Sequence, residues 1–372
     1  MNTKTKTKTS KLSKSSFSPL FNKKLRVHSL KTLKPQTLKL CDDLLHLQII
    51  KNNRTICKSY NSSSVQELLL YNLKSSKHLD ISRFIPPIQL SANCWFNTMF
   101  VTFFFSDKGR KFFRYFRELM ITGRKLDNSL IPTSIAKLFF ILNLFIEASY
   151  NQNTKSKALF RVLNNLTNKL NTNFFIYHIY QIINNKPNSI NPDILFKNNN
   201  KLYNINEAGN PIAYYESILK YLNYNTLQIM RVAFQFKSND VSQVIKQKFY
   251  NDSLTNIFDI IIIEDFESKS IFETSYKLVD SKNINYNYVL DSIILTNKDH
   301  FNPEANSHFV SVLTCNNEEY KYDGSSISKF EQFKWKKLIN TNKNWSFKEN
   351  QKYEPEFYNF TKGYKIMFYY RS

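Results

Sequence analysis

Two patterns of hydrophobic residues divide the chain. Up to Met230 apolar side chains recur at helical spacing, whereas later they gather in short β-branched and aromatic runs between polar stretches. The first pattern predicts helices at Val65–Leu73, Cys94–Arg117, Ile135–Ala148, Ala158–Ile183 and Ile212–Leu222. The second predicts strands at Ile257–Ile263, Tyr288–Leu295, Phe309–Thr314, Glu319–Tyr322 and Tyr364–Tyr370. Helices followed by strands indicate an α+β fold.

Proline and asparagine mark the boundaries between the parts of the chain. The pair Pro86-Pro87 interrupts it, so we place the start of the main domain there. We therefore expect a basic arm at residues 1–36, an N-terminal extension at 37–84 and the main domain at 85–372. The Asn-rich stretch Asn184–Asn206 is expected to be a loop or an insertion.

Positive charge is concentrated at the start of the chain. The formal net charge is +23, and residues 1–36 hold ten Lys or Arg residues and no acidic residue. Such a segment cannot bury enough apolar surface to fold alone, so we expect a disordered arm. Two interpretations stay open: the arm contacts nucleic acid or another polyanion, or it solubilises the protein without a partner. The abundance of Lys, Asn, Ile and Phe is typical of AT-rich genomes, such as those of large DNA viruses and protists.

The apolar segments and the cysteines bear on the compartment. No secretory signal is recognisable, and the longest apolar run, Ala136–Ile146, is too short to span a bilayer, so we expect a soluble, cytoplasmic protein. The four cysteines, Cys41, Cys57, Cys94 and Cys315, include no C-x-x-C pair. Neither a structural zinc site nor a disulfide framework is expected, which suits a reducing compartment.

One cysteine lies where its thiol can be activated. The segment Gln89-Leu-Ser-Ala-Asn-Cys94-Trp-Phe-Asn97 places Cys94 at the start of a predicted apolar helix. The positive end of a helix dipole favours a thiolate, which is the nucleophilic form of cysteine. The Gln89 amide lies close enough in sequence to donate a hydrogen bond to an oxyanion beside the sulfur. Taken alone, a cysteine on an apolar helix is also ordinary core packing.

A histidine and an aspartate could complete this site. His308 lies at the head of a predicted strand, where its ring can meet a thiol on a neighbouring helix. Among the six histidines the serious competitor is His300, which falls in a polar loop. Asp323 follows a second short strand, so a hairpin would bring its carboxylate to the ring N–H of His308 and fix the ring's tautomer. Read separately, His308 could be structural and Asp323 part of an ordinary turn.

Together these segments resemble the ubiquitin-specific proteases. That family's cysteine box is matched, with Gln in place of the usual Asn, by Gln89, Cys94, Trp95, Phe96 and Asn97. Its histidine box is similar to His308, Phe309, Val310 and the run Tyr320-Lys321-Tyr322-Asp323. The strand before that box, the terminal strand and, more loosely, the family's helical box resemble Tyr288–Leu295, Gly363–Arg371 and Gly209–Leu219.

The resemblance implies a fold and a reaction. The fold would be that of a papain-like cysteine peptidase, with a helical half carrying Cys94 and an antiparallel sheet half carrying His308 and Asp323. Cys94 would be the nucleophile, His308 its general base, Asp323 the residue that orients the base, and Gln89 an oxyanion donor. No metal or cofactor is implied, and the substrate would be ubiquitin or a ubiquitin-like protein in isopeptide conjugates.

The sequence also departs from the family. Ser91 and Ser307 replace two usual glycines, and the paired-cysteine zinc fingers are missing. Acidic residues that could meet the basic tail of ubiquitin are few, the candidates being Glu264, Asp265 and Glu267. Two alternatives therefore stay open. The protein could be a papain-like protease that cuts viral or other precursor proteins, in the host cytoplasm or the virion, or a catalytically silent protein that binds nucleic acid or has a structural role.

Overall fold

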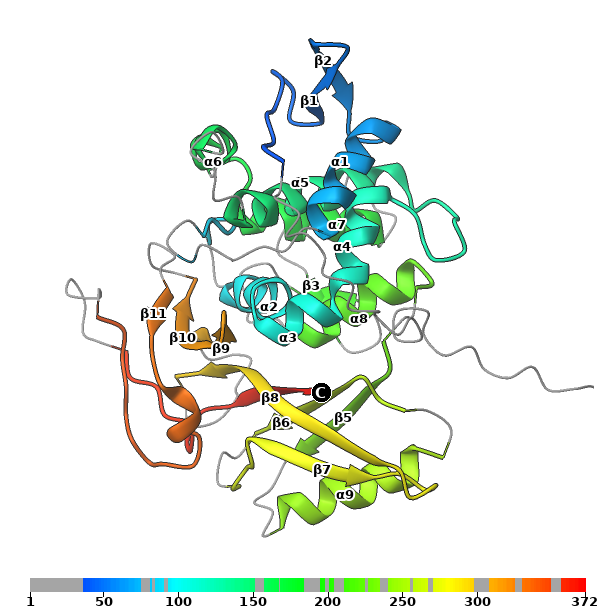
Figure 1. Cartoon of the computed structure of the whole chain (residues 1–372). Helices are drawn as coiled ribbons and strands as arrows, with labels where there is room; N and C mark the ends of the chain where they lie inside the picture. Colours follow the sequence, from blue (N-terminus) through cyan, green and yellow to red (C-terminus); the bar gives the residue numbers. More distant parts are fainter. Residues whose placement is uncertain are drawn as a thin grey trace, which may run out of the picture. The chain divides into compact units, whose positions relative to one another are not determined.

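Helices come first along the chain and most strands follow, as the computed structural model in Figure 1 shows. It describes residues 36–74, 81, 84–89, 93–150, 157–166, 168–183, 195–197, 201–203, 211–224, 227–234, 240–254, 257–266, 270–297, 308–324, 330–348 and 356–372. The expected arm, apart from its last residue, lies outside these ranges, and its disorder and its contact with polyanions stay predictions. The mixed α+β architecture confirms the predicted fold class at that level.

The helices match most of the predicted segments. They are α1 (Ser63–Lys74), α2 (Cys94–Phe104), α3 (Asp107–Phe112), α4 (Arg114–Thr122), α5 (Thr133–Tyr150), α6 (Lys157–Asn165), α7 (Thr172–Ile183), α8 (Pro211–Tyr221) and α9 (Val241–Asp252). The predicted helix Cys94–Arg117 is divided into three pieces. Ser106 ends the first of them, because its hydroxyl accepts a hydrogen bond from the Gly109 N–H and caps α3. Helix α9 was not predicted.

The main sheet contains all five predicted strands, together with three that were not predicted. Its strands are β5 (Ile229–Phe234), β6 (Ile260–Asp265), β7 (Ser275–Val279), β8 (Asn285–Thr296), β9 (Phe309–Cys315), β10 (Glu318–Asp323), β11 (Phe330–Gln332) and β12 (Lys365–Arg371). The order is β11-β10-β9-β8-β12-β6-β5, and β7 pairs with β8. The pairs are antiparallel except β5 with β6, which is parallel, so the expected antiparallel sheet is mixed at that edge.

Two short hairpins lie outside this sheet. The strands β1 (His46–Lys51) and β2 (Arg54–Ser59) form one, and β3 (Leu195–Lys197) and β4 (Lys201–Tyr203) form the other. The second hairpin lies within Asn184–Asn206, the stretch expected to be a loop or an insertion, and the rest of that stretch lies outside the described residues. The β1–β2 turn was missed because it is Asn52-Asn53, both at positive φ, in place of an Asn-Gly pair.

The sheet is buried on both faces by two hydrophobic cores. Side chains alternate along each strand, so Ile260 and Ile262 of β6 face the core formed with α2 and most other helices, while Ile261 and Ile263 face the core formed with α9. Burial on both faces explains why β6 begins with four consecutive isoleucines. Helix α2 contacts β8, β9 and β10, so the helix that begins at Cys94 lies against the strands that follow His308 and precede Asp323.

A disulfide corrects one expectation drawn from the sequence. Cys41 and Cys57 are joined, and their bond fastens β2 to the segment that precedes β1. The number of cysteines in a long chain could not reveal that two of them face each other across a hairpin. The expected absence of disulfides was one argument for a reducing compartment, and the Cys41–Cys57 bond removes it. The cytoplasmic location stays a prediction. Among the described residues, no helix has the length and apolar character needed to cross a membrane.

The disulfide predicts how many thiols can be labelled. Denatured but unreduced protein should take up two alkyl groups, on Cys94 and Cys315, which are the free cysteines, and reduced protein should take up four. Intact-mass analysis counts the groups directly. Four groups without reductant would show that Cys41 and Cys57 are not joined in the isolated protein.

Candidate active site

Cys94 is the first residue of α2 and touches the start of β9. Its sulfur accepts a hydrogen bond of 3.1 Å from the backbone N–H of Phe309, and the residue is only 1% exposed. The two residues are separated by 215 positions in the sequence. The contact therefore fixes the beginning of the helix against the strand that directly follows His308.

The residue before Cys94 is held by another helix. Asn93 accepts a hydrogen bond of 2.6 Å from the Thr172 hydroxyl through Oδ1, and its Nδ2 donates to Asn173 at the start of α7. Because the Asn93 side chain is turned toward α7, it does not cap α2. The Asn93 side chain therefore leaves the first-turn N–H groups of α2, which carry the positive end of the helix dipole, uncapped, although the Phe96 N–H donates to the Asn93 carbonyl at 3.0 Å.

His308 and Asp323 meet through the β9–β10 hairpin. Asp323 ends β10 and pairs with Val310, so it lies diagonally opposite His308 on the same face of the sheet. His308 Nε2 and Asp323 Oδ1 are 2.7 Å apart, and the two side chains are 15% and 2% exposed. The backbone N–H of His308 also donates to Asn297 Oδ1 at 3.1 Å, which fixes the start of β9 next to the end of β8.

The electrostatics of His308 indicate a paired ring. Burial alone would lower the pKa of His308, but hydrogen bonds to Asp323 and Cys94, together with the charges of these two groups, raise it well above its ordinary value. Since Nε2 contacts Asp323, Nδ1 is the ring nitrogen left for Cys94. The structure thus brings Cys94, His308 and Asp323 together. Their catalytic roles stay predictions.

The other free cysteine has a contrasting environment. Cys315, at the end of β9, is fully buried. Burial raises the pKa of its thiol to about 12; Arg110 opposes this rise, and the nearby carboxylates of Asp107 and Asp291 add to it. A thiol with such a pKa stays protonated near neutral pH, so Cys315 is not expected to act as a nucleophile.

The strand that carries Asp323 is anchored on both faces. Tyr322 packs toward the helices, with ring centroids 5.4 Å from Phe84 and 5.1 Å from Phe330. On the other face the Lys321 ammonium pairs with Glu331 at 2.9 Å. The same ammonium lies over a group of aromatic rings, those of Phe333, Trp345 and Phe347. The alternating aromatic-Lys-aromatic-Asp run therefore fastens β10 firmly beside His308.

The remaining predicted site residues are only partly placed. Gln89 ends the described segment 84–89; its side chain is half-buried and its Oε1 is buried. Ser91, Ser307 and the competitor His300 lie outside the described residues, so the position of Gln89 relative to Cys94 stays a prediction. Within the described ranges, no group of three or more His, Cys, Asp or Glu side chains could hold a metal ion.

The acidic candidates are used inside the fold. Asp265 pairs with Lys365 at 2.6 Å and is fully buried. Glu264 is also buried and is bonded by Arg231 and by the Tyr364 hydroxyl. Neither carboxylate is available to a basic partner, which corrects the suggestion that they could meet one. Glu267, the third candidate, lies outside the described residues.

The sequence analysis did not predict the hydrogen bonds that join the start of α3 to the β9–β10 hairpin and to β8. The Asp107 carboxylate accepts hydrogen bonds from the N–H groups of Asn316 (2.9 Å) and Asn317 (2.8 Å), the two positive-φ residues of the β9–β10 turn. Asp291 of β8 accepts from the N–H groups of Lys108 (3.0 Å) and Gly109 (3.4 Å). The start of α3 is thus attached to the β9–β10 turn and to the middle of β8. The Asn316-Asn317 pair marks a turn, but nothing in the sequence links that turn to Asp107.

The buried Asp291 makes stability depend on pH. Burial raises the pKa of its carboxyl to about 6, although hydrogen bonds from Ser106 and Lys108 oppose the rise. A pKa raised in the folded state favours the protonated form there, so this contribution to stability is complete below about pH 4 and is lost as pH rises through about 6.

Asp291→Asn keeps an acceptor oxygen without the charge. We expect the unfolding free energy of the variant to gain roughly 3 kcal/mol relative to wild type between pH 4 and pH 7. Urea denaturation at several pH values in this range measures the unfolding free energy of both proteins. The same dependence on pH in wild type and variant would contradict this prediction.

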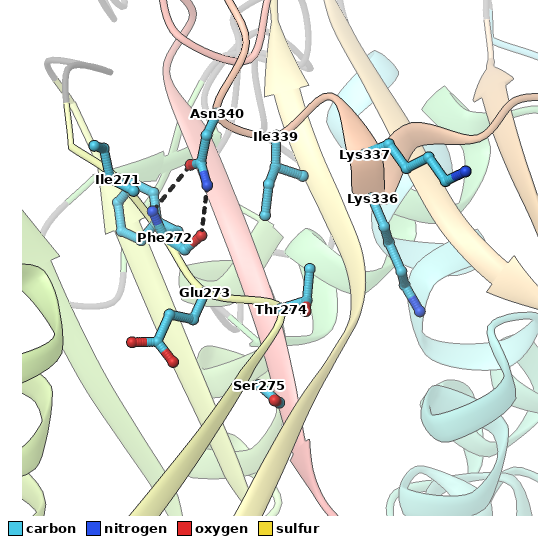
Figure 2. Close-up of a pocket in the computed structure, with 9 residues that line it drawn as sticks. All are labelled: Ile271, Phe272, Glu273, Thr274, Ser275, Lys336, Lys337, Ile339 and Asn340. Carbon is cyan, nitrogen blue, oxygen red and sulfur yellow. Dashed lines mark hydrogen bonds between the residues drawn. The ribbon is translucent and has the colours of Figure 1, made fainter.

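Two cavities lie away from these residues. One, of about 430 Å³, is bounded by the 3₁₀ turn Trp335–Lys337 and the segment before β7, and Figure 2 shows Asn340 bonded to both the N–H and the carbonyl of Phe272 beside it. Another, of about 650 Å³, lies between α5 and α7, beside Leu45 and Tyr221. None of the residues that line these two cavities belongs to the Cys94, His308 and Asp323 group.

Comparison with known proteins finds likeness among solved structures only. No family profile matches the sequence, and no curated protein matches it. Among solved structures, the chain is similar to the SAGA DUB module of Ubp8, Sgf11, Sus1 and Sgf73 bound to monoubiquitin. That match has a TM-score of 0.34 and 9% sequence identity, and covers 88% of this chain and 81% of the other.

Proposed function

We propose that this protein is a papain-like cysteine peptidase in which Cys94 is the nucleophile and His308 the general base. The observation that carries the proposal is the meeting of three side chains from distant parts of the sequence. His308 contacts Asp323 at 2.7 Å, and the hydrogen bond between His308 and Cys94 contributes to the raised pKa of the ring. A nucleophile hydrogen-bonded to a base, itself oriented by a third group, is the arrangement used in nucleophilic acyl transfer.

The proposed reaction proceeds in two steps. Cys94 gives its proton to His308 and attacks the carbonyl carbon, while Gln89 and the first N–H groups of α2 stabilise the oxyanion. When the C–N bond breaks, His308 returns the proton to the leaving amine and a thioester remains on Cys94. Water then attacks the thioester, His308 takes its proton, and the carboxylic acid leaves as the Cys94 sulfur is released. Asp323 holds the imidazole ring in the tautomer that both steps need.

The proposed substrate is the bond after the C-terminal glycine of ubiquitin or of a ubiquitin-like protein. The support is the resemblance of the two sequence segments that contain Cys94 and His308 to the boxes of the ubiquitin-specific proteases. Because Glu264 and Asp265 are engaged in buried ion pairs, any acidic contacts to a basic tail would come from other residues.

Hydrolysis of a ubiquitin C-terminal amide reporter tests this proposal. We expect release of the reporter by the full chain and no release by Cys94→Ala. Digestion of an unstructured protein such as casein, without release of the reporter, would favour a peptidase that cuts precursor proteins. Absence of both activities in folded protein would contradict the proposal and favour a catalytically silent protein.

Gln89 is expected to contribute less than the other three residues. If its amide is one of several oxyanion donors, Gln89→Ala should lower kcat by about a hundredfold, because one such donor is typically worth roughly 3 kcal/mol. Steady-state kinetics on the same reporter measures the change. Unchanged kcat would assign the oxyanion site to backbone N–H groups alone.

A further inference from the structure

Asn97 lies one helical turn after Cys94 and is completely buried. It is on the same face of α2 as Cys94, since residues three apart in a helix lie one above the other. An asparagine that is fully withdrawn from water has to satisfy its amide within the protein. The hydrogen-bond partners of the Asn97 side chain therefore indicate which segments this residue holds in place.

The Asn97 amide reaches the segment that leads to Gln89. Its Nδ2 donates a hydrogen bond of 2.9 Å to the carbonyl oxygen of Pro87. The next residue, Ile88, accepts a hydrogen bond of 2.9 Å from the Thr172 N–H at the start of α7. The chain just before Gln89 is therefore fixed by α2 through one carbonyl and by α7 through the next.

The same side chain supports the turn after Asp323. A Cβ atom placed on Gly324 would lie 2.9 Å from Asn97 Cβ and 3.3 Å from Asn97 Nδ2. These separations are too short for an ordinary contact, so the Gly324 backbone rests directly against Asn97. Asp323 directly precedes Gly324 and contacts His308. Asn97 therefore packs against the residue that directly follows Asp323.

Only the nitrogen of the Asn97 amide makes a hydrogen bond among the described residues. The Asn97 Oδ1 is buried and has no hydrogen-bond partner among the described residues. A buried acceptor without a partner destabilises the fold, and an apolar side chain of similar volume would avoid that cost. The donor bond to Pro87 is the one hydrogen bond of the side chain that could justify an amide at this position.

We propose that Asn97 is a positioning residue that holds the Pro87–Gln89 segment and the Asp323–Gly324 turn in register with Cys94. The proposal rests on the proposed function for its kinetic consequences. Among the described residues, the side-chain hydrogen bond of Asn97 goes to Pro87, and not to the Cys94 sulfur or the His308 ring. Asn97 acts through two neighbours, the oxyanion segment on one side and the orienting carboxylate on the other.

Two variants disturb these contacts separately. Asn97→Leu keeps a side chain of similar size without the donor, and Gly324→Ala pushes the turn away from Asn97. Each should lower kcat on the ubiquitin reporter by about tenfold or more, with little change in KM, because small displacements of reacting groups cost large factors in rate. Because both substitutions change the surroundings of the same Asn97 side chain, the double variant should lose less than the product of the two single losses.

A second readout needs no knowledge of the substrate. Iodoacetamide alkylates Cys94, and peptide mass mapping measures the extent of alkylation at each pH. The pH of half-maximal alkylation reports on the pairing of Cys94 with His308. We expect this pH to rise in both variants, because a displaced Asp323 stabilises the charged imidazole ring less. Thr102→Val, a buried polar residue farther along α2, is the matched control and should leave the alkylation profile and kcat unchanged.

The outcomes separate this inference from the proposed function. If wild type fails to hydrolyse the reporter, the proposed function is wrong, yet a raised alkylation pH in Asn97→Leu and Gly324→Ala still supports the positioning role. If folded Asn97→Leu and Gly324→Ala behave like Thr102→Val in alkylation, whatever their thermal stability, the positioning role is wrong. Thermal unfolding of each variant verifies that the protein compared is folded.

Discussion

Replacing Cys94 with alanine is expected to abolish turnover of a ubiquitin reporter while the protein stays folded. The loss should reach roughly a millionfold in kcat, as in enzymes whose nucleophile is removed from a catalytic triad. The structure adds a consequence for stability. Because the Phe309 N–H donates to the sulfur, alanine leaves a buried donor unpaired at a cost of about 1–3 kcal/mol. Thermal unfolding should therefore show a Tm lowered by several degrees.

A second substitution separates the two effects. Cys94→Ser keeps an acceptor for Phe309, so it should recover much of the lost Tm without recovering turnover. Cys315→Ala is the matched control, since burial of Cys315 keeps its thiol protonated at neutral pH. Turnover that survives in Cys94→Ala and disappears in folded Cys315→Ala would show that the nucleophile has been assigned to the wrong cysteine.

Asp323→Asn is expected to have the second largest effect. The amide has nearly the shape of the carboxylate, but it no longer compensates a charged His308 ring and can favour the wrong tautomer. Loss of this role typically lowers kcat by about ten-thousandfold without eliminating activity. The pKa of His308 should also fall, because its contact with Asp323 is one cause of the raised value. The pH dependence of kcat and NMR titration of the ring measure these two changes.

A matched buried carboxylate serves as the control. Asp280, at the turn between β7 and β8, accepts hydrogen bonds from the N–H groups of Lys282 and Ile284 and lies in another hairpin. Asp280→Asn should alter stability but not the pH profile. Equal kcat values for wild type and Asp323→Asn would remove Asp323 from the proposed mechanism.

Hydrophobic pattern alone predicted the order of the helices and most of the central strands. The prediction succeeded for β6, β8, β9 and β12 because these strands are largely buried on both faces and are rich in β-branched and aromatic residues. It missed β5, β7 and β11, which lie at edges or off the main path of the sheet and carry exposed polar or small residues. Their position depends on neighbours that are distant in sequence.

The candidate site could be read from the sequence only as three separate segments. Cys94, His308 and Asp323 each lie at the end of an element, where side chains can reach across to other elements. The residues that fix these three side chains in place could not be predicted from local sequence patterns. Asn297 fixes the His308 backbone, and Asp107 clasps the turn between β9 and β10. Such contacts join residues that are close only after the chain has folded, and they leave no local pattern.

The most direct test of the account is covalent labelling with ubiquitin that carries an electrophile at its C-terminus. Intact-mass analysis and peptide mapping of the product identify the labelled residue. The account predicts one ubiquitin per chain, attached to Cys94, lost in Cys94→Ala and retained in Cys315→Ala. Labelling of another residue, or no labelling of folded protein whose Cys94 still reacts with iodoacetamide, would contradict it.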